Sequence, residues 1–377
     1  MVQNKIYLNY FKEIVKTFLV ILFALSIIAW TVRAVSFLDL IVENGYSIST
    51  YFQYSILNLI GILTKFIPLA FLIALVIFIL KQIHENEFII LWTSGVKKIK
   101  LANLFFLISI VFLFFYLVFS TLITPYALNK SRHILSKDGF NSFLPTIRIQ
   151  QFSDSFKGFT FFVGDKIDNK IKNVFIHDKS NKLKTLSANQ SSNSSTTIVA
   201  QRGVVLEKKM ILFKGQVITS EKDSLKSNII KFEQLNIDLK NLETDTIKVP
   251  KLQETSTLTL LTCFDNKSFK TSFCEQKTKK EIITVLNRRI VLPFYIPIVA
   301  LLSSLLLIKS YSKKNYLFNK YSVFSFGFLT LLFAELVIRY TGISKIVNLI
   351  FIISPIVLII LIYFFLMFMF ARESISR

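Results

Sequence analysis

The stretch LANLFFLISIVFLFFYLVFSTLI, residues 101–123, contains no charged residue along its whole length. About twenty consecutive apolar residues are enough for a helix to span a lipid bilayer, so this stretch predicts a transmembrane helix. The rest of the chain has a similar character, because 53% of its 377 residues are hydrophobic. Such a composition is too apolar for an ordinary soluble protein.

Other windows of the chain meet the same test, and they are residues 18–37, 54–80, 290–308, 321–340 and 346–370. The sequence therefore predicts six spans, three before and three after a long polar middle. A basic segment precedes the first window, as in a signal peptide, but no small-residue cleavage site follows it. We expect an uncleaved first helix.

The net charge of +22 raises the question of nucleic-acid binding. The lysines are spread along the chain, however, and some of them lie in short loops beside the spans. Membrane proteins carry Lys and Arg in such loops on the cytoplasmic side. These residues are Lys5, Lys12, Lys16, Lys81, Lys97, Lys98, Lys100, Lys309, Lys313, Lys314, Lys320, Arg372 and Arg377. Their distribution predicts cytoplasmic termini and an outer middle domain, with no nucleic-acid partner.

The middle of the chain, residues 125–287, is rich in Ser, Asn, Lys and Thr and contains short apolar–polar alternations. The alternations are IRIQQF from 147, FTFFVG from 159, KNVFIHD from 172, TTIVAQRGVVL from 196, MILFKGQVI from 210 and NIIKFEQLNIDL from 228. Period-two patterns with β-branched and aromatic residues are typical of half-buried strands. They predict an all-β sandwich, jelly roll or barrel between residues 1–124 and 288–377.

Cys263 and Cys274 are the only two cysteines, and both lie in the part expected outside the membrane. An oxidising compartment permits them to form a disulfide, and they could equally be unpaired. The three histidines, His84, His133 and His177, are scattered along the sequence. Since two cysteines alone do not complete a zinc shell, we expect no metal site.

The motifs of several enzyme classes are absent from the sequence, which contains no GxxxxGK[ST], GxSxG or HExxH pattern. We therefore expect no catalytic residues and no cofactor. If the protein performs work, a partner must supply the energy.

Two basic residues fall inside the first and second windows, where ionisable groups are costly and indicate candidate sites. Arg33 lies near the far end of the first window. It could extend to the interface or contact an anionic lipid headgroup. Lys65 lies deeper in the second window, and we expect it to face a polar cavity or a partner chain.

Further ionisable residues mark the fourth and fifth windows. Glu335 and Arg339 are spaced i, i+4, which favours an ion pair on one helix face over contact with a substrate. Arg288 and Arg289 stand at the start of the fourth window, where they could bind phosphates or serve as anchors. Arg33, Lys65, Arg288 and Arg339 are therefore candidates for binding an acidic, acyl-bearing lipid.

Between the second and third windows lies HENEFIILWTSGVKKIK, residues 84–100. It predicts a short amphipathic helix over Glu87–Trp92, with Phe88, Leu91 and Trp92 on one face and an end at Ser94-Gly95. Such a helix could dock in a groove on another protein. It could also lie on the lipid surface, with Trp92 as its anchor.

This segment, together with IPLAF at 67–71, resembles the permeases of the LptF/LptG family of lipopolysaccharide export. That family has a proline-containing second span followed by E-x-E-x-x-x-L/M-x-x-x-G. RRIVLP at 288–293 and the three-plus-three layout fit the same family, and the E-x-E spacing is closer to LptF than to LptG. The resemblance covers nearly the whole chain in layout, and mainly residues 60–100 in detail.

The resemblance implies a polytopic α-helical protein of the bacterial inner membrane with an inserted periplasmic jelly-roll-like domain. It implies a permease subunit of an ABC-type complex that extracts lipopolysaccharide and passes it to a periplasmic bridge. The implied partners are an LptB-like ATPase dimer, a second LptG-like or LptF-like permease and a single-span LptC-like protein. The ATPase-coupling residues would be Glu85, Glu87, Phe88, Leu91, Trp92 and Gly95. Trp92-Thr93-Ser94 departs from the small residues that the family more often has before the glycine.

Two other functions are alternatives. Mechanical ABC permeases of the FtsX/MacB type have four spans, with the outer domain after the first. A membrane-anchored envelope sensor would need an output domain, and no stretch expected in the cytoplasm is long enough to form one.

Overall fold

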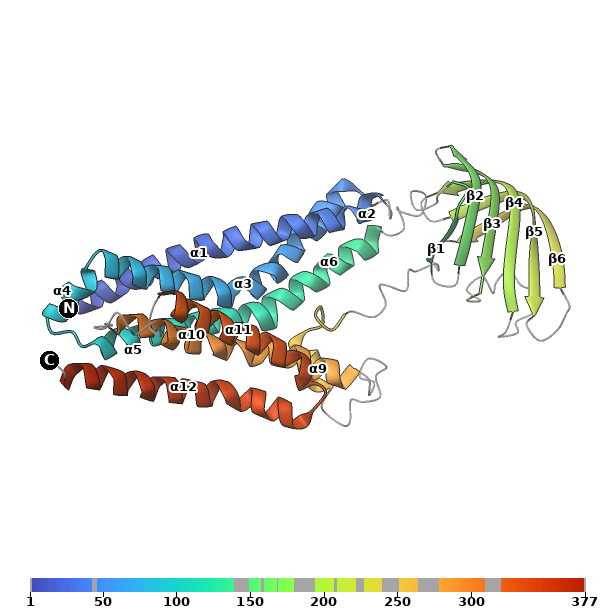
Figure 1. Cartoon of the computed structure of the whole chain (residues 1–377). Coiled ribbons are helices and arrows are strands. Elements are labelled where there is room, and N and C mark those ends of the chain that lie inside the picture. The colour runs from blue at the N-terminus through green and yellow to red at the C-terminus, as the bar shows by residue number, and fades with distance from the viewer. Residues whose placement is uncertain are drawn as a thin grey trace. The chain divides into compact units, whose positions relative to one another are not determined.

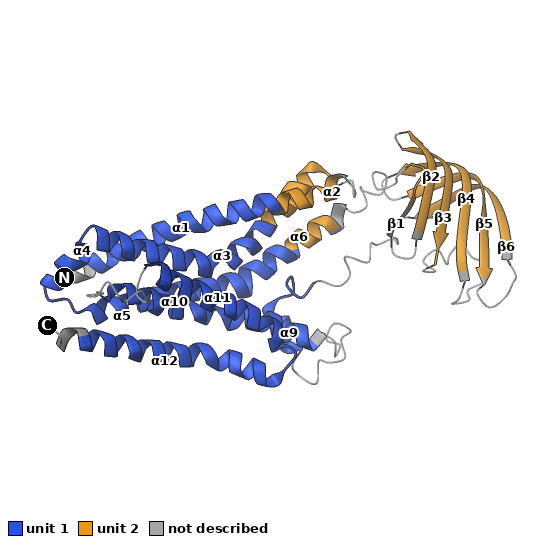
Figure 2. Cartoon of the chain, in the orientation of Figure 1, with its two compact units in different colours: residues 1–32, 58–129, 251–377 blue, residues 33–57, 130–250 orange. Residues whose placement is uncertain are grey.

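The computed structural model describes residues 2–42, 46–138, 149–156, 159–167, 169–179, 194–206, 209–221, 227–238, 251–263, 278–308 and 320–375 (Figure 1). The chain divides into two compact units, coloured separately in Figure 2. Unit 1 contains residues 1–32, 58–129 and 251–377, and unit 2 contains residues 33–57 and 130–250. Each unit is considered by itself.

Six helices of the described chain are long and apolar enough to cross a membrane. They are α1 (Val2–Phe37); α3 (Ile48–His84); α5 (Lys98–Val118), continued by η1 (Phe119–Ile123) and α6 (Thr124–Asp138); α9 (Thr278–Ile290), continued by η4 (Leu292–Phe294), α10 (Tyr295–Ser304) and η5 (Leu305–Leu307); α11 (Lys320–Thr341); and α12 (Lys345–Ile375). Short helices are α2 (Asp39–Val42), α4 (Glu87–Thr93) and α8 (Thr257–Thr262). The predicted six spans, arranged three and three, are confirmed.

The core of unit 1 is centred on α3 and α10. Of the apolar window in the α9–η5 helix, 78% is buried, and for α3 the share is 61%, whereas α11 and α12 have 22% and 17%. Gly327 of α11 lies so close to α3 that an added Cβ would come within 2.7 Å of Leu72 Cδ1. Because α11 and α12 bury so little of their apolar windows, many of their apolar side chains are left for lipid or other proteins to cover.

In its described residues, unit 2 contains one six-stranded antiparallel sheet, in which the strands follow one another in chain order. Its strands are β1 (Phe152–Phe156), β2 (Phe159–Ile167), β3 (Lys170–Asp178), β4 (Ser194–Leu206), β5 (Lys209–Glu221) and β6 (Ser227–Asp238). Five of the six sequence alternations coincide with β2 to β6. The first alternation begins in residues outside the described part, and its Ile149 bridges to Val163 before β1 starts at Phe152.

One face of this sheet is apolar and buried. It is built from alternate residues such as Phe161 and Val163 of β2, Ile198 and Ala200 of β4, and Leu212 of β5. The inserted all-β domain is thus confirmed, but its described strands form a meander, whereas a jelly roll consists of two Greek keys. Short connections explain this order, since only residues 168–169 separate β2 from β3 and only 207–208 separate β4 from β5.

The polar middle of the sequence is helical at both ends. α6 continues to Asp138, α8 lies before residue 288, and α9 begins ten residues before it, at Thr278. Polar composition therefore begins before the helices end, because a helix can continue beyond its membrane-embedded part. Cys263 is disulfide-bonded and packs with Leu260 and Ile282. Cys274 lies outside the described residues, so its pairing with Cys263 stays a prediction.

Candidate functional site

The short helix α4 (Glu87–Thr93) is present where the sequence predicted it, between α3 and α5. Asn86 at its start has φ 59°, which turns the chain out of α3. At its end the Gly95 N–H donates to the Trp92 carbonyl at 3.2 Å, and the Val96 N–H donates to the Leu91 carbonyl at 3.0 Å. This pair of bonds is a Schellman motif, for which Gly95 supplies the required positive φ of +87°.

Phe88 fixes the inner face of α4 to the core of unit 1. Its side chain is 1% exposed. The ring meets Tyr10 of α1 edge to face, with centroids 6.2 Å apart, and Tyr10 in turn meets Phe78 of α3 at 5.3 Å. Edge-to-face pairs add to the free energy gained from burial. The position of α4 is therefore tied to both α1 and α3.

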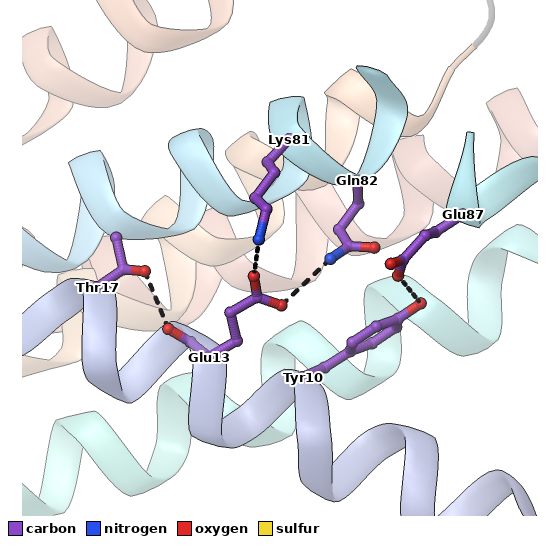
Figure 3. A network of polar contacts seen from close by, with 6 residues as sticks. All are labelled: Tyr10, Glu13, Thr17, Lys81, Gln82 and Glu87. Atoms are coloured by element: carbon purple, nitrogen blue, oxygen red, sulfur yellow. Dashed lines mark hydrogen bonds and ion pairs between the residues drawn. The ribbon is translucent and has the colours of Figure 1, made fainter. Parts of the chain in front are cut away.

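Polar contacts beside Phe88 strengthen the same connection (Figure 3). The Tyr10 hydroxyl donates to Glu87 Oε2 at 3.5 Å, which is a long and weak bond. Glu13, one turn further along α1, forms an ion pair with Lys81 and accepts a bond from Gln82 Nε2 at 3.2 Å. An ionised carboxylate has about four acceptor positions, so Glu87 retains capacity for donors from another molecule.

The outer face of α4 is also apolar. Ile89 and Ile90 are 48% and 66% exposed, and the neighbouring Glu85 is exposed as well. An apolar helix face is normally covered by another element or molecule. In the described chain, only the Phe88 side of α4 is covered by the core.

A groove of about 340 Å³ lies between α4 and the end of the α10–η5 segment. It is lined by Ile83, Phe88, Ile89, Trp92, Thr93, Leu306, Leu307 and Ile308. Trp92 forms one wall, and Lys98 Nζ lies 4.7 Å from the centroid of its ring. The groove and Ile90 together form an exposed apolar surface, which we call the α4 surface.

The predicted coupling residues differ in exposure. Phe88 borders the groove but is 1% exposed and packs in the core, and Leu91 and Trp92 are half-buried against that core, with Trp92 lining the groove. The sequence predicted all three on one docking face. Phe88 is thus a positioning residue, and the exposed apolar residues are Ile89 and Ile90. The sequence signal for them was the unbroken apolar run FIILW, residues 88–92, which places apolar side chains on more than one face of the helix.

Arg289, which could have bound phosphate or served as an anchor, is an anchor. It is only 6% exposed. Its guanidinium donates to the carbonyls of Leu252 at 3.2 Å, Gln253 at 2.9 Å and Thr255 at 2.9 Å, and to Thr257 Oγ1 at 2.9 Å. These bonds fix the segment that follows the strand-containing part of the chain onto α9.

The same cluster of hydrogen bonds includes the third membrane helix, at its π-helical turn η1. The Thr257 hydroxyl donates to the Thr121 carbonyl at 2.7 Å, and the Ser120 hydroxyl donates to the Arg289 carbonyl at 2.7 Å. A π-turn inside an α-helix frees carbonyl groups from regular bonding. Here a hydroxyl from another segment bonds one of the carbonyls in that turn.

Arg288 has a different environment from its neighbour. Its Nη2 donates to Glu335 Oε1 of α11 at 2.6 Å, and the two side chains are 32% and 45% exposed. The expected i, i+4 pair of Glu335 with Arg339 is replaced by this pair between helices. The reason is tertiary, since α9 packs against α11 and brings Arg288 to Glu335.

The other predicted lipid-binding residues are exposed on three different helices. Arg33 is exposed on α1 within unit 2, and Arg339 is exposed on α11 within unit 1. Lys65 is exposed on α3, beside Thr64, whose buried hydroxyl lies 2.7 Å from that of Thr124. Lys65 therefore points away from the core of unit 1. Across the described ranges, no three His, Cys, Asp or Glu side chains gather to hold a metal ion.

Comparison with known proteins identifies the family of the chain. The chain is 29% identical over 181 residues to the uncharacterized protein RP871 of Rickettsia prowazekii (strain Madrid E). That match covers 47% of this chain and 49% of the relative, so it spans about half the length of each. The family described as lipopolysaccharide export system permease LptF/LptG matches residues 9–369, nearly the whole chain. The protein therefore belongs to the LptF/LptG family of permeases.

Proposed function

We propose that this protein is a permease subunit of an ABC-type lipopolysaccharide export complex in a bacterial inner membrane, with both termini in the cytoplasm. In this proposal a separate LptB-like ATPase dimer hydrolyses ATP, and the chain itself catalyses no reaction. The observation that carries the proposal is the structure of α4. Its Phe88 is locked in the core, while Ile89, Ile90 and the α4 groove remain uncovered.

The contacts of α4 provide a path for movement. An ATPase that holds the α4 surface and the carboxylate of Glu87 moves a helix that is tied to α1 through Tyr10. Glu13 ties α1 to the end of α3 through Lys81 and Gln82. A displacement of α4 is therefore passed to α1 and α3 together, because these contacts join α4 to α1 and join α1 to α3.

The lipid path in this proposal uses several weak cationic contacts. Arg33, Lys65, Arg288 and Arg339 are candidates for the acidic headgroup. A transported lipid must also leave, so several modest contacts serve better than one strong one. The apolar face of the β-sheet would receive the acyl chains, and an LptC-like protein would accept the lipid next. The exposed apolar sides of the outer helices fit a second permease, LptG-like or LptF-like.

The two alternative functions agree less well with the chain. A permease of the FtsX/MacB type has four spans, with the outer domain after the first. In the described part of this chain, the strands follow the third of six helices that are long and apolar enough to cross a membrane. A sensor needs an output domain, and the cytoplasmic segments of the proposed topology are too short to form one.

Charge reversal at Glu87 tests the proposal. We expect Glu87→Lys to abolish co-purification of the ATPase and lipopolysaccharide transport, because a cation then faces the donors that a carboxylate would bind. The matched control is Glu281→Lys, which reverses an exposed glutamate on α9. ATPase retained by the Glu87 variant at the level of the control would contradict the docking role of α4.

A further inference from the structure

Arg288 has unused hydrogen-bonding capacity. A guanidinium has five N–H donors. The structure gives Arg288 one bond to a side chain, from Nη2 to Glu335, and its buried Nε has no partner among the described residues. Arg289, the adjacent residue, instead donates four bonds within its own unit. Arg288 is thus an arginine whose binding capacity the fold has not used.

The ion pair with Glu335 is open to competition. Both side chains are partly exposed, so another molecule can reach either of them. Exposed pairs contribute little to stability, while charged groups within membrane helices are costly. An ion pair that is costly to place in membrane helices and adds little to the stability of the fold is expected where its charged groups have a function.

Helix α11 packs against α9, α10 and α12, but it leaves most of its apolar window uncovered. Only 22% of its apolar window is buried, compared with 78% for the α9–η5 helix. Among its buried residues are Ala334 and Ile338, which stand on either side of Glu335 along the helix. The Arg288–Glu335 pair is therefore a partly exposed polar contact between two helices that also pack against each other, and it borders the uncovered side of α11.

The surroundings of Glu335 fit an amphiphile. Phe328 and Leu332 precede it by seven and three residues, so they share its side of α11, and both are exposed. Arg339, one turn beyond, is exposed on the same side. An acidic headgroup could bind the two arginines while an acyl chain lies along Phe328 and Leu332. A guanidinium suits a phosphate especially well, because it donates two parallel bonds.

We propose that Arg288 is a binding site for the phosphate group of an amphiphile and that Glu335 is its built-in competitor. In the ligand-free state Glu335 holds Arg288. A phosphate that takes the guanidinium displaces the Glu335 carboxylate from it. This inference rests on the proposed function, in which such a lipid is the transported molecule, and assigns one site and one competing carboxylate to it.

Binding of a phosphorylated glycolipid to the full-length chain in lipid nanodiscs tests the site. Removal of the competitor in Glu335→Gln is expected to raise the affinity about tenfold, which corresponds to about 1.4 kcal/mol. Arg288→Gln is expected to lower the affinity to that of the same glycolipid without phosphate. Glu281→Gln, on the same helix as Arg288, is the control and should leave the affinity unchanged.

Further measurements distinguish the ways in which the proposal could be wrong. Inorganic phosphate should not compete at the concentrations at which the glycolipid binds, and equal competition would overturn the assignment to an amphiphile. The exchanged pair Arg288→Glu with Glu335→Arg restores the ion pair and should keep the melting temperature of the unmodified chain, which shows that the variants fold. Unchanged affinity in Glu335→Gln, with ATPase association intact, would overturn the competitor role and leave the proposed function standing.

Discussion

Two parts of unit 1 place neighbouring residues of like chemistry in opposite roles. On α4, Phe88 is 1% exposed and anchors the helix, whereas Ile90 is 66% exposed. On α9, Arg289 is buried against backbone carbonyls, whereas Arg288 is partly exposed and held by one carboxylate. In both pairs an exposed residue has a buried neighbour that fixes its position. Substitutions at the two members of each pair should therefore have different effects.

The largest difference is expected between the two arginines. Arg289→Ala leaves several carbonyls and the Thr257 hydroxyl without their donor, and each unsatisfied buried group is costly. We expect the free energy of unfolding to fall by about 4 kcal/mol, whereas Arg288→Ala should cost about 1 kcal/mol because its ion pair is partly exposed. Denaturant unfolding of the purified protein in detergent measures both. Equal losses would show that Arg289 is not the anchor of the 251–257 segment.

The pair on α4 should show a similar but smaller difference. Phe88→Ala removes a buried aromatic ring and leaves a cavity, so we expect a loss of about 3 kcal/mol. Ile90→Ala removes exposed atoms and should change stability by no more than about 0.5 kcal/mol. The melting temperatures of the two variants, compared with the unmodified protein, test this. A large loss for Ile90→Ala would mean that unit 1 itself covers this side chain.

The smallest effect concerns the end of α4. Gly95 has a positive φ, while the position of an added Cβ is open space. Gly95→Ala should therefore cost about 1 kcal/mol from backbone conformation alone. The matched control is Gly61→Ala in α3, where the added Cβ makes ordinary contacts and alanine favours the helix. If both variants were equally stable, the Schellman turn would not determine where α4 ends.

Much of this architecture could be predicted from the sequence because the signals are local. The span at residues 101–123 is a continuous apolar run, the strands from Phe159 onward alternate, and Ser94-Gly95 marks the end of α4. Partners distant in sequence could not be predicted. The bonds of Arg289 cross 32 to 37 residues, and the pair of Arg288 with Glu335 crosses 47.

Local sequence signals also could not predict which face of α4 is buried. Phe88, Ile89, Ile90 and Leu91 are all apolar, so the sequence alone does not distinguish an inner from an outer side. The packing of Tyr10 against Phe88 makes that choice, and Tyr10 lies 77 residues before Glu87, the residue it bonds. Helix packing thus decides which of several equivalent apolar residues is presented to a partner.

Site-specific photo-crosslinking at position 90 tests the central claim, that α4 presents its outer face to a cytoplasmic ATPase. A photoreactive residue replaces Ile90 in the full-length chain, and the control replaces Ile167, an exposed isoleucine of β2. The account predicts that position 90 crosslinks to the ATPase in native membranes and that position 167 does not. Absence of the ATPase from the products at position 90, while the complex still transports lipopolysaccharide, would contradict it.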